Sequence, residues 1–258
     1  MLTLTDVTKS FGDRRVLDGV SVEVASGQSV ALLGANGSGK TTTLRCLVGL
    51  ARPDKGSIAI CGVDVVRDGV RARSHLSYLP QKSVFPGTLT VRESLAVIAR
   101  LRPTDRDAVD RELDACGLVH LADRTVAHLS GGERQRLAMG IAFLPTVELY
   151  LFDEASANLD PAARRILFGR ARQLNRDGRT LLFTTHIPAD VRHLATRAIV
   201  LRDGRIHSDS VGVFELRRHE RLLEQEIWGD DHDDPTRDGG AVDRIDVDGR
   251  LRGTGAVA

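Results

Sequence analysis

The chain of 258 residues is long enough for one large domain or two small ones, and its 41% hydrophobic content is ordinary for a globular protein. Its 36 lysines and arginines nearly balance its 35 aspartates and glutamates, so the formal charge of +1 provides no basic field of the kind that binds nucleic acid. We therefore expect no nucleic-acid partner.

Apolar runs in the sequence are too short to cross a membrane. A spanning helix needs about twenty mostly apolar residues, whereas the longest runs are short pieces such as Val30 to Leu33 and Leu149 to Phe152. Residues Met1 to Gly12 also lack the basic start and apolar run of a secretory signal. These features predict a cytoplasmic chain without a membrane-spanning segment.

The three cysteines, Cys46, Cys61 and Cys116, show no metal-ligand spacing, and their odd number argues against a disulfide framework. We expect buried, unreactive thiols. The acidic stretch Asp230 to Asp234 around His232 could bind a cation weakly, but its composition is more typical of a solvated, disordered segment.

Short strands open the chain. Residues Met1 to Val24 and Ser57 to Val66 alternate in polarity and contain Gly/Asp turns, which predicts a small antiparallel sheet. Aliphatic and β-branched runs indicate buried parallel strands at Ser29 to Leu33, Leu149 to Phe152, Thr180 to Phe183 and Ala198 to Leu201. Helical patterns lie between them at Thr41 to Leu50, Arg134 to Leu144 and Ala162 to Leu174. This alternation predicts an open α/β sheet, whose ligands bind at the carboxyl ends of its strands.

Two further segments depart from that alternation. The pattern from Lys82 to Ser130 is mostly helical, with candidates at Val91 to Arg102 and Asp107 to Cys116, which indicates a helical subdomain inserted at about residues 82–140. After Asp203-Gly204 the sequence predicts a polar helix through about Trp228. Residues 229–258 have too few apolar side chains to build a core, which predicts a disordered tail after a folded domain of residues 1–228.

A phosphate-binding loop is predicted after the first buried strand. The loop reads Gly34, Ala35, Asn36, Gly37, Ser38, Gly39, Lys40 and Thr41, and a helix begins at its end. Glycines let backbone N–H groups converge on phosphate oxygens, and the helix amino terminus adds a partial positive charge. Lys40 would reach the β and γ phosphates, Thr41 would offer a hydroxyl to Mg²⁺, and Thr42 would donate to phosphate. The alternative, a merely flexible glycine loop, does not explain the match in both letters and context.

Two carboxylates end the strand Leu149 to Phe152. Asp153 can hold Mg²⁺ through water, as the second acidic element of phosphate-loop ATPases does. Glu154 would point to the opposite side and polarise the attacking water. The alternative is a pair of charges that caps a helix at a turn.

A third motif, Leu129-Ser130-Gly131-Gly132-Glu133, precedes the helix expected at Arg134 to Leu144. Alone it could be a glycine turn with an N-cap serine. Together with the phosphate loop upstream and Asp153-Glu154 downstream, it resembles the signature motif of ABC ATPases, and the order of motifs over about Leu2 to Arg205 matches that family. The resemblance implies an α/β phosphate-loop NTPase core with a flanking antiparallel β subdomain and an inserted helical subdomain.

The resemblance also implies roles for residues outside these motifs. Gln81 looks like the family's glutamine that touches Mg²⁺ and responds to the transport partner. His186 falls where the family keeps a histidine near the γ phosphate, although a strand-end histidine is otherwise often a surface residue. Phe11 and Val16 occupy the positions of the adenine-stacking aromatic and its apolar neighbour. The stretch Ala157 to Asp160 is similar to the loop that communicates across the dimer.

Three departures from the family pattern are present. Phe11 replaces the commoner tyrosine, which keeps the stacking face but loses a hydroxyl. Ala155 follows Glu154 where proline is usual, so the turn there is expected to be looser. The segment from about Gly229 matches no family motif.

The family mechanism implies a second ATPase subunit and an integral membrane permease as partners. Ser130 and Gly132 of one protomer would contact the γ phosphate held by Lys40 of the other, with the positive end of the following helix directed there. ATP and Mg²⁺ are the implied cofactors, and the subunit would sit on the inner face of the membrane through its permease. The stretch Phe85 to Leu95 most resembles subunits of drug and ABC-2 exporters.

Two other functions fit parts of the pattern. A soluble ABC ATPase of cluster assembly remains an alternative, whereas DNA-maintenance members insert a long coiled coil before the signature motif and translation members usually have two cassettes. A catalytically silent nucleotide-binding regulator is the second alternative. The presence of Lys40, Asp153, Glu154 and His186 together disfavours it.

Overall fold

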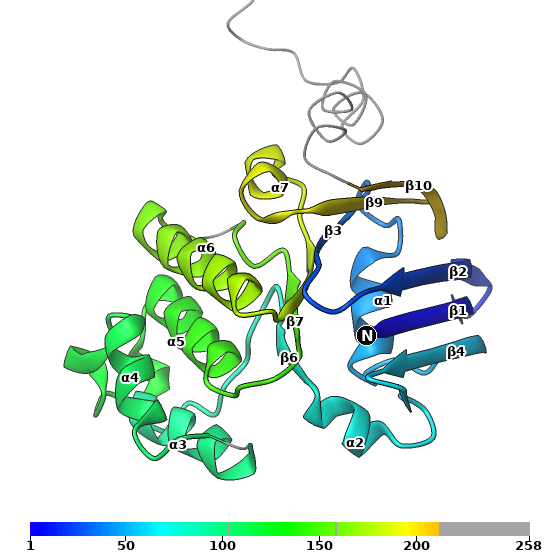
Figure 1. Ribbon diagram of the computed structural model, residues 1–258. Coiled ribbons are helices and arrows are strands. Elements are labelled where there is room, and N and C mark those ends of the chain that lie inside the picture. Colours follow the sequence, from blue (N-terminus) through cyan, green and yellow to red (C-terminus); the bar gives the residue numbers. More distant parts are fainter. Residues whose placement is uncertain (103, 158, 212–258) are drawn as a thin grey trace, which may run out of the picture.

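Figure 1 shows the computed structural model, which describes residues 1–102, 104–157 and 159–211. The strands of this part of the chain form a four-stranded sheet in the order β2-β1-β4-β5 and a six-stranded sheet in the order β10-β9-β3-β8-β7-β6. The predicted α/β architecture is confirmed. The predicted tail of residues 229–258, and residues 212–228 of the predicted polar helix, lie outside the described residues.

The four-stranded sheet is antiparallel, as predicted. Its strands are β1 (Leu2–Phe11), β2 (Arg14–Val24), β4 (Lys55–Ile60) and β5 (Val63–Asp64). Leu2, Leu4 and Val7 of β1 are buried, because one face of the sheet packs on the core while the other faces solvent.

The six-stranded sheet is the centre of the fold. It contains β3 (Ser29–Leu33), β6 (Leu76–Leu79), β7 (Leu149–Asp153), β8 (Thr180–Thr184), β9 (Arg197–Arg202) and β10 (Arg205–Val211). The neighbouring strands β6 and β7, β7 and β8, β8 and β3, and β3 and β9 pair in parallel. Strand β10 pairs antiparallel with β9. Every residue of β3, β7 and β8 is buried, as expected for parallel strands covered on both faces.

Successive residues of β3 contribute to two different hydrophobic clusters. Ala31 and Leu33 pack with the helical side of the molecule, whereas Val30 and Leu32 pack with the antiparallel sheet. Because side chains alternate across a strand, one short segment anchors both layers. The helical subdomain and the antiparallel sheet therefore lie on opposite sides of the central sheet (Figure 1).

The prediction of a polar helix after Gly204 is wrong for residues 205–211, which form β10. Arg197 of β9 donates from Nε and Nη2 to both carboxylate oxygens of Asp209, at 2.7 and 2.6 Å. Pairing with the edge of β9 supplies the backbone hydrogen bonds that a local helix would otherwise have made. A long-range pairing thus overrides the local pattern.

The helices next to the central sheet are α1 (Lys40–Leu47), α2 (Gly69–Ser74), α6 (Pro161–Arg176) and α7 (Pro188–Leu194). The sequence predicted α1 through Leu50, but the helix ends earlier at a glycine. Gly49 has φ +76°, its N–H donates to Cys46 O, and the Leu50 N–H donates to Arg45 O. These two bonds form a Schellman motif, which terminates the helix.

The helical subdomain contains α3 (Val91–Leu101), α4 (Ala108–Ala115) and α5 (Gly131–Phe143), with 3₁₀ turns η1 (Val119–Leu121) and η2 (Val126–His128) before α5. Helix α5 starts three residues before the predicted Arg134, because Ser130 caps it. None of the described helices has the length and hydrophobicity needed to span a bilayer.

A nearly buried ion pair joins the subdomain to the core. Glu112 of α4 accepts two 2.5 Å hydrogen bonds from Arg170 of α6, whose guanidinium lies 4.6 Å from the centre of the Phe143 ring. Only 8% of the Glu112 side chain is exposed. We expect Glu112→Ala to lower the free energy of unfolding by about 3 kcal/mol, because it leaves the partly buried Arg170 charge unpaired.

Urea denaturation of the purified chain measures this loss. The double variant Glu112→Leu/Arg170→Met is the control, since replacing both charges by apolar groups should restore most of the lost stability. A double variant as unstable as Glu112→Ala would contradict the explanation.

Candidate functional site

The predicted phosphate-binding loop connects β3 to α1, the position that the sequence indicated. Gly34 and Gly39 have φ of +149° and +112°. A Cβ at Gly34 would lie 2.2 Å from the Leu201 carbonyl oxygen, and one at Gly39 would lie 2.9 Å from the Val16 carbonyl oxygen. Both contacts are with backbone and cannot relax easily, so the close approach of the loop to its neighbours requires glycine.

Lys40, the first residue of α1, is 5% exposed and turns back over the loop. Its Nζ donates to the carbonyl oxygens of Gly34 at 2.7 Å and Ala35 at 3.1 Å. Burial lowers the pKa of the Lys40 ammonium, while the charges of Glu154 and Asp153 act in the opposite direction. The loop carbonyls therefore hold the ammonium in place beside a cavity that Lys40 helps to line.

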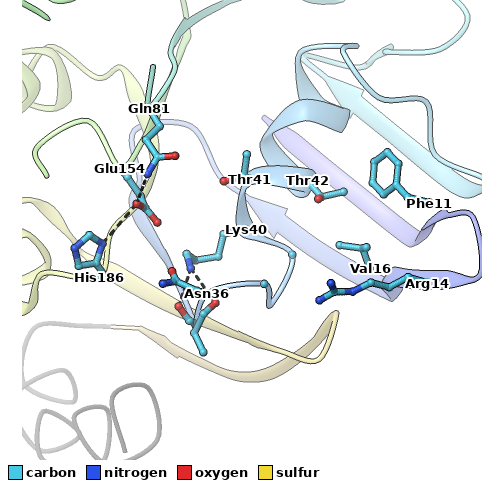
Figure 2. Close-up of a pocket in the computed structure, with 14 residues that line it drawn as sticks. Phe11, Arg14, Val16, Asn36, Lys40, Thr41, Thr42, Gln81, Glu154 and His186 are labelled. Atoms are coloured by element: carbon cyan, nitrogen blue, oxygen red, sulfur yellow. Dashed lines mark hydrogen bonds and ion pairs between the residues drawn. The ribbon is translucent and has the colours of Figure 1, made fainter. Parts of the chain in front are cut away.

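A cavity of about 790 Å³ opens at this loop, within the size range of small-molecule sites. Figure 2 shows Gln81, Glu154 and His186 on one side of Lys40, and Thr42, Phe11, Val16 and Arg14 on the other. The predicted site residues that line it are Phe11, Val16, Gly34, Ala35, Asn36, Gly37, Gly39, Lys40, Thr41, Thr42, Gln81, Glu154 and His186. The structure thus brings together residues from five separate segments of the chain.

Sequence reasoning missed Arg14 at this cavity. It begins β2, between Phe11 and Val16, and its guanidinium lies near Gly37 of the loop. An exposed arginine next to a turn looks like an ordinary solvated charge in the sequence. Only the fold of the hairpin against the phosphate loop brings it to the site.

Asp153 lies behind the cavity rather than on its surface, with 1% exposure. Its Oδ1 accepts hydrogen bonds from Thr41 Oγ1 at 3.1 Å and Thr184 Oγ1 at 2.8 Å, and its Oδ2 accepts one from Tyr78 Oη at 3.2 Å. Burial and the Asp153 charge raise the pKa of Tyr78. Three hydroxyls therefore fix this carboxylate, and the contributions of Tyr78 and Thr184 were not foreseen.

Glu154 adopts φ +47°, a conformation that costs a non-glycine residue about 1–3 kcal/mol. Its N–H donates to Thr184 Oγ1 at 2.9 Å, which helps to hold this backbone. The carboxylate accepts a 2.8 Å hydrogen bond from Gln81 Nε2 and lies 3.6 Å from His186 Nδ1 (Figure 2). The strained residue thus directs its carboxylate into the cavity, away from the partners of Asp153.

Ser130 and Gly132 are exposed and do not line the cavity. Ser130 is the N-cap of α5: its Oγ accepts from the Glu133 N–H at 3.3 Å, and the Glu133 carboxylate accepts from the Ser130 N–H at 2.7 Å. Within a single chain, Ser130 therefore acts as the N-cap of α5, which was the alternative interpretation of its motif. The predicted Ser38 also lies outside the main cavity and borders a smaller neighbouring pocket.

The segments that carry Glu154 and His186 are tied together by one buried carboxylate. Asp190, 2% exposed, accepts hydrogen bonds from Ser156, Thr185 and Arg164. Ser156 follows Glu154 by two residues, and Thr185 precedes His186. Of the predicted dimer loop, Asp160 caps α6 and pairs with Arg136, whereas Asn158 lies outside the described residues.

The thiols follow the prediction in part. Cys46 and Cys116 are buried, and burial raises their pKa to about 11 and about 12, which leaves them protonated and unreactive. Cys61 is only partly buried.

Comparison with known proteins gives consistent results. The "ABC transporter" family model matches residues 17–157. The chain is 39% identical over 203 residues to the Nod factor export ATP-binding protein I of Paraburkholderia xenovorans, covering 77% of this chain and 67% of that protein.

Solved structures of ABC ATP-binding proteins are also similar to the chain. One is the ATP-binding subunit of an ABC transporter, with a TM-score of 0.79 and 29% identity over 86% of this chain and 94% of that one. Another is a dimeric, post-hydrolysis ATP-binding cassette bound to ADP and Pi, with a TM-score of 0.73 and 25% identity over 82% and 98%. The chain therefore belongs to the ABC transporter family, as an ATP-binding subunit with ATPase activity.

Proposed function

We propose that two ATPase subunits, this chain and a second copy or a homologue, close around ATP and drive a separate integral membrane permease. The position of Ser130 carries this proposal. It lies exposed at the amino terminus of the 13-residue helix α5 and outside the cavity that holds Lys40. A helix amino terminus favours anions, so Ser130 and Gly132 would complete the phosphate site of a partner subunit.

In this proposal ATP lies along the cavity with its base near Phe11 and Val16. Phe11 is 51% exposed and so offers an aromatic face for stacking. The loop from Gly34 to Gly39 would cradle the phosphates with its backbone, and Lys40 would exchange its carbonyl partners for the β and γ phosphates. Arg14, at the same side as Phe11, adds a second cation to the site.

Mg²⁺ would be held by Thr41, Gln81 and Asp153. The Thr41 hydroxyl already lies 3.1 Å from Asp153, and the donor set consists of oxygen atoms, which Mg²⁺ prefers. When bound, Mg²⁺ neutralises charge that develops on the phosphates. The hydrogen bonds from Tyr78 and Thr184 would hold the Asp153 carboxylate in place for this purpose.

Glu154 would orient and activate the attacking water as the general base. Its carboxylate already has two polar neighbours at the cavity, Gln81 and His186, and His186 would contact the γ phosphate. Loss of the γ phosphate would weaken the closed dimer, because the contacts of Ser130 with it disappear. The dimer would then open and reset the permease.

We also propose that the transport is export and that the permease holds the subunit at the inner face of the membrane. The relative from Paraburkholderia xenovorans, with 39% identity, is named an export ATP-binding protein. The resemblance of residues 85–95 to subunits of drug and ABC-2 exporters points in the same direction.

A complementation experiment tests the shared site. Lys40→Ala removes the phosphate-binding cation, and Ser130→Arg blocks the surface offered to a partner. We expect each variant alone to be inactive as an ATPase. A mixture of the two should regain part of the activity, because mixed dimers contain one site built from the intact loop of one chain and the intact Ser130 of the other.

A mixture without activity, while each variant still folds, would show that the site is not shared between chains. The membrane partner is tested separately by reconstituting the chain with a candidate permease in liposomes. We expect ATP turnover several-fold above that of the chain alone, and equal turnover would contradict the coupling.

A further inference from the structure

Three metal-ligating side chains from distant segments meet at an edge of the fold far from the nucleotide cavity. Cys61 lies in the turn between β4 and β5, His75 follows α2, and Glu148 precedes β7. Their ligand atoms all lie within 4.8 Å of one another. His75 Nδ1 is 3.3 Å from Glu148 Oε2. The three side chains are therefore close enough to converge on a single metal ion after small side-chain adjustments.

The backbone at Cys61 is unusual for a cysteine. Cys61 and Gly62 have φ of +51° and +78°, and the two flanking residues, Ile60 and Val63, pair across the hairpin. This is a type I′ turn, in which Asn, Asp or Gly is strongly preferred at the first position. A cysteine there carries backbone strain that the turn itself does not favour, although its side chain packs against the neighbouring hydrophobic cluster.

Ligand chemistry selects the metal. A thiolate, an imidazole and a carboxylate together suit Zn²⁺, whereas Mg²⁺ and Ca²⁺ take oxygen ligands. Three protein ligands leave the fourth position of a tetrahedral site to solvent. Cys61 Sγ also lies 3.3 Å from Sδ of Met1, so a second sulfur is next to the thiol.

Exposure allows an ion to reach the site. The His75 and Glu148 side chains are 28% and 48% exposed, and Cys61 is partly buried. By contrast, the thiols of Cys46 and Cys116 are enclosed in the core. The cluster is therefore accessible, unlike the other cysteines.

We propose that Cys61, His75 and Glu148 bind Zn²⁺ and thereby fasten the antiparallel sheet to the central sheet. Glu148 is adjacent to the first residue of β7, and Asp153 is its last. A five-residue strand spans roughly 13 Å between its ends, so the zinc site is separate from the nucleotide site. Zinc would act on stability rather than on the chemistry of hydrolysis.

The test is a titration of the chelator-treated, full-length protein with Zn²⁺ in the absence of nucleotide, in competition with a chromophoric chelator. We expect one ion to bind per chain and to raise the melting temperature. Cys61→Asn, His75→Gln and Glu148→Gln should each weaken this binding by at least about tenfold and abolish the zinc-dependent rise in melting temperature.

Two comparisons separate the loss of a ligand from misfolding. Asparagine suits the positive φ of residue 61 better than cysteine, so Cys61→Asn should be at least as stable as the wild type without zinc. His120→Gln replaces an exposed histidine of η1 and serves as the matched control, with unchanged binding expected.

Several results would overturn the proposal. These are the absence of stoichiometric binding, binding that survives all three ligand changes, and an equal loss in His120→Gln. Binding that survives would place the ion elsewhere, for example in residues 230–234, outside the described part of the chain.

Discussion

Lys40→Ala is expected to abolish ATP hydrolysis, with turnover falling by about 10³-fold or more, the scale of removing a key electrostatic group from a reaction centre. Lys40 is the buried cation of the cavity, and its Nζ is held by the carbonyls of Gly34 and Ala35. Alanine would remove the positive charge that these carbonyls hold at the loop and that is expected to contact the β and γ phosphates. Steady-state phosphate release from purified protein measures the effect.

Lys55→Ala is the matched control, since Lys55 is an exposed lysine of β4 that does not line the cavity. It should hydrolyse ATP at the wild-type rate. Circular dichroism and the melting temperature should show that Lys40→Ala remains folded. Hydrolysis by folded Lys40→Ala at the wild-type rate would refute the role of this lysine.

Glu154→Gln is expected to slow hydrolysis by about 10²-fold or more while ATP binding survives, in line with the loss of a general base. Glutamine has the same size and can still accept the hydrogen bond from Gln81 Nε2, but it lacks the negative charge that activates water. Because ATP then persists, the variant should accumulate as an ATP-dependent dimer. Size-exclusion chromatography with ATP and Mg²⁺ detects this dimer.

Two variants control this result. Asp153→Asn changes the neighbouring carboxylate, whose partners are the hydroxyls of Thr41, Tyr78 and Thr184. It should weaken Mg²⁺ binding and give no stable dimer. Ser130→Arg in the Glu154→Gln background should prevent dimerisation. A Glu154→Gln protein that binds ATP tightly yet stays monomeric would contradict the shared site. One that hydrolyses ATP normally would contradict the assignment of Glu154 as the general base.

The sequence by itself determined the parts of the site that are contiguous along the chain. The loop from Gly34 to Thr41 carries its strand, its glycines and its helix start in one segment, so local rules were enough to place it. The N-cap role of Ser130, which the sequence offered as an alternative for its motif, is equally local, and the structure adds Glu133 to form a capping box. The buried strands around Asp153 could be predicted because their apolar runs are continuous.

Only the tertiary structure decided which distant residues meet. The hydroxyls of Tyr78 and Thr184 reach Asp153 because β6, β7 and β8 are neighbours in the sheet. The order of strands in a sheet cannot be predicted from the residues of any single strand. Strand β10 replaced a predicted helix for the same reason, since its partner edge is supplied by β9. The cysteines showed no ligand spacing, yet Cys61, His75 and Glu148 converge. Contacts between segments far apart in sequence depend on how whole layers pack. The hydrophobic periodicity within one segment does not specify which distant segment packs against it.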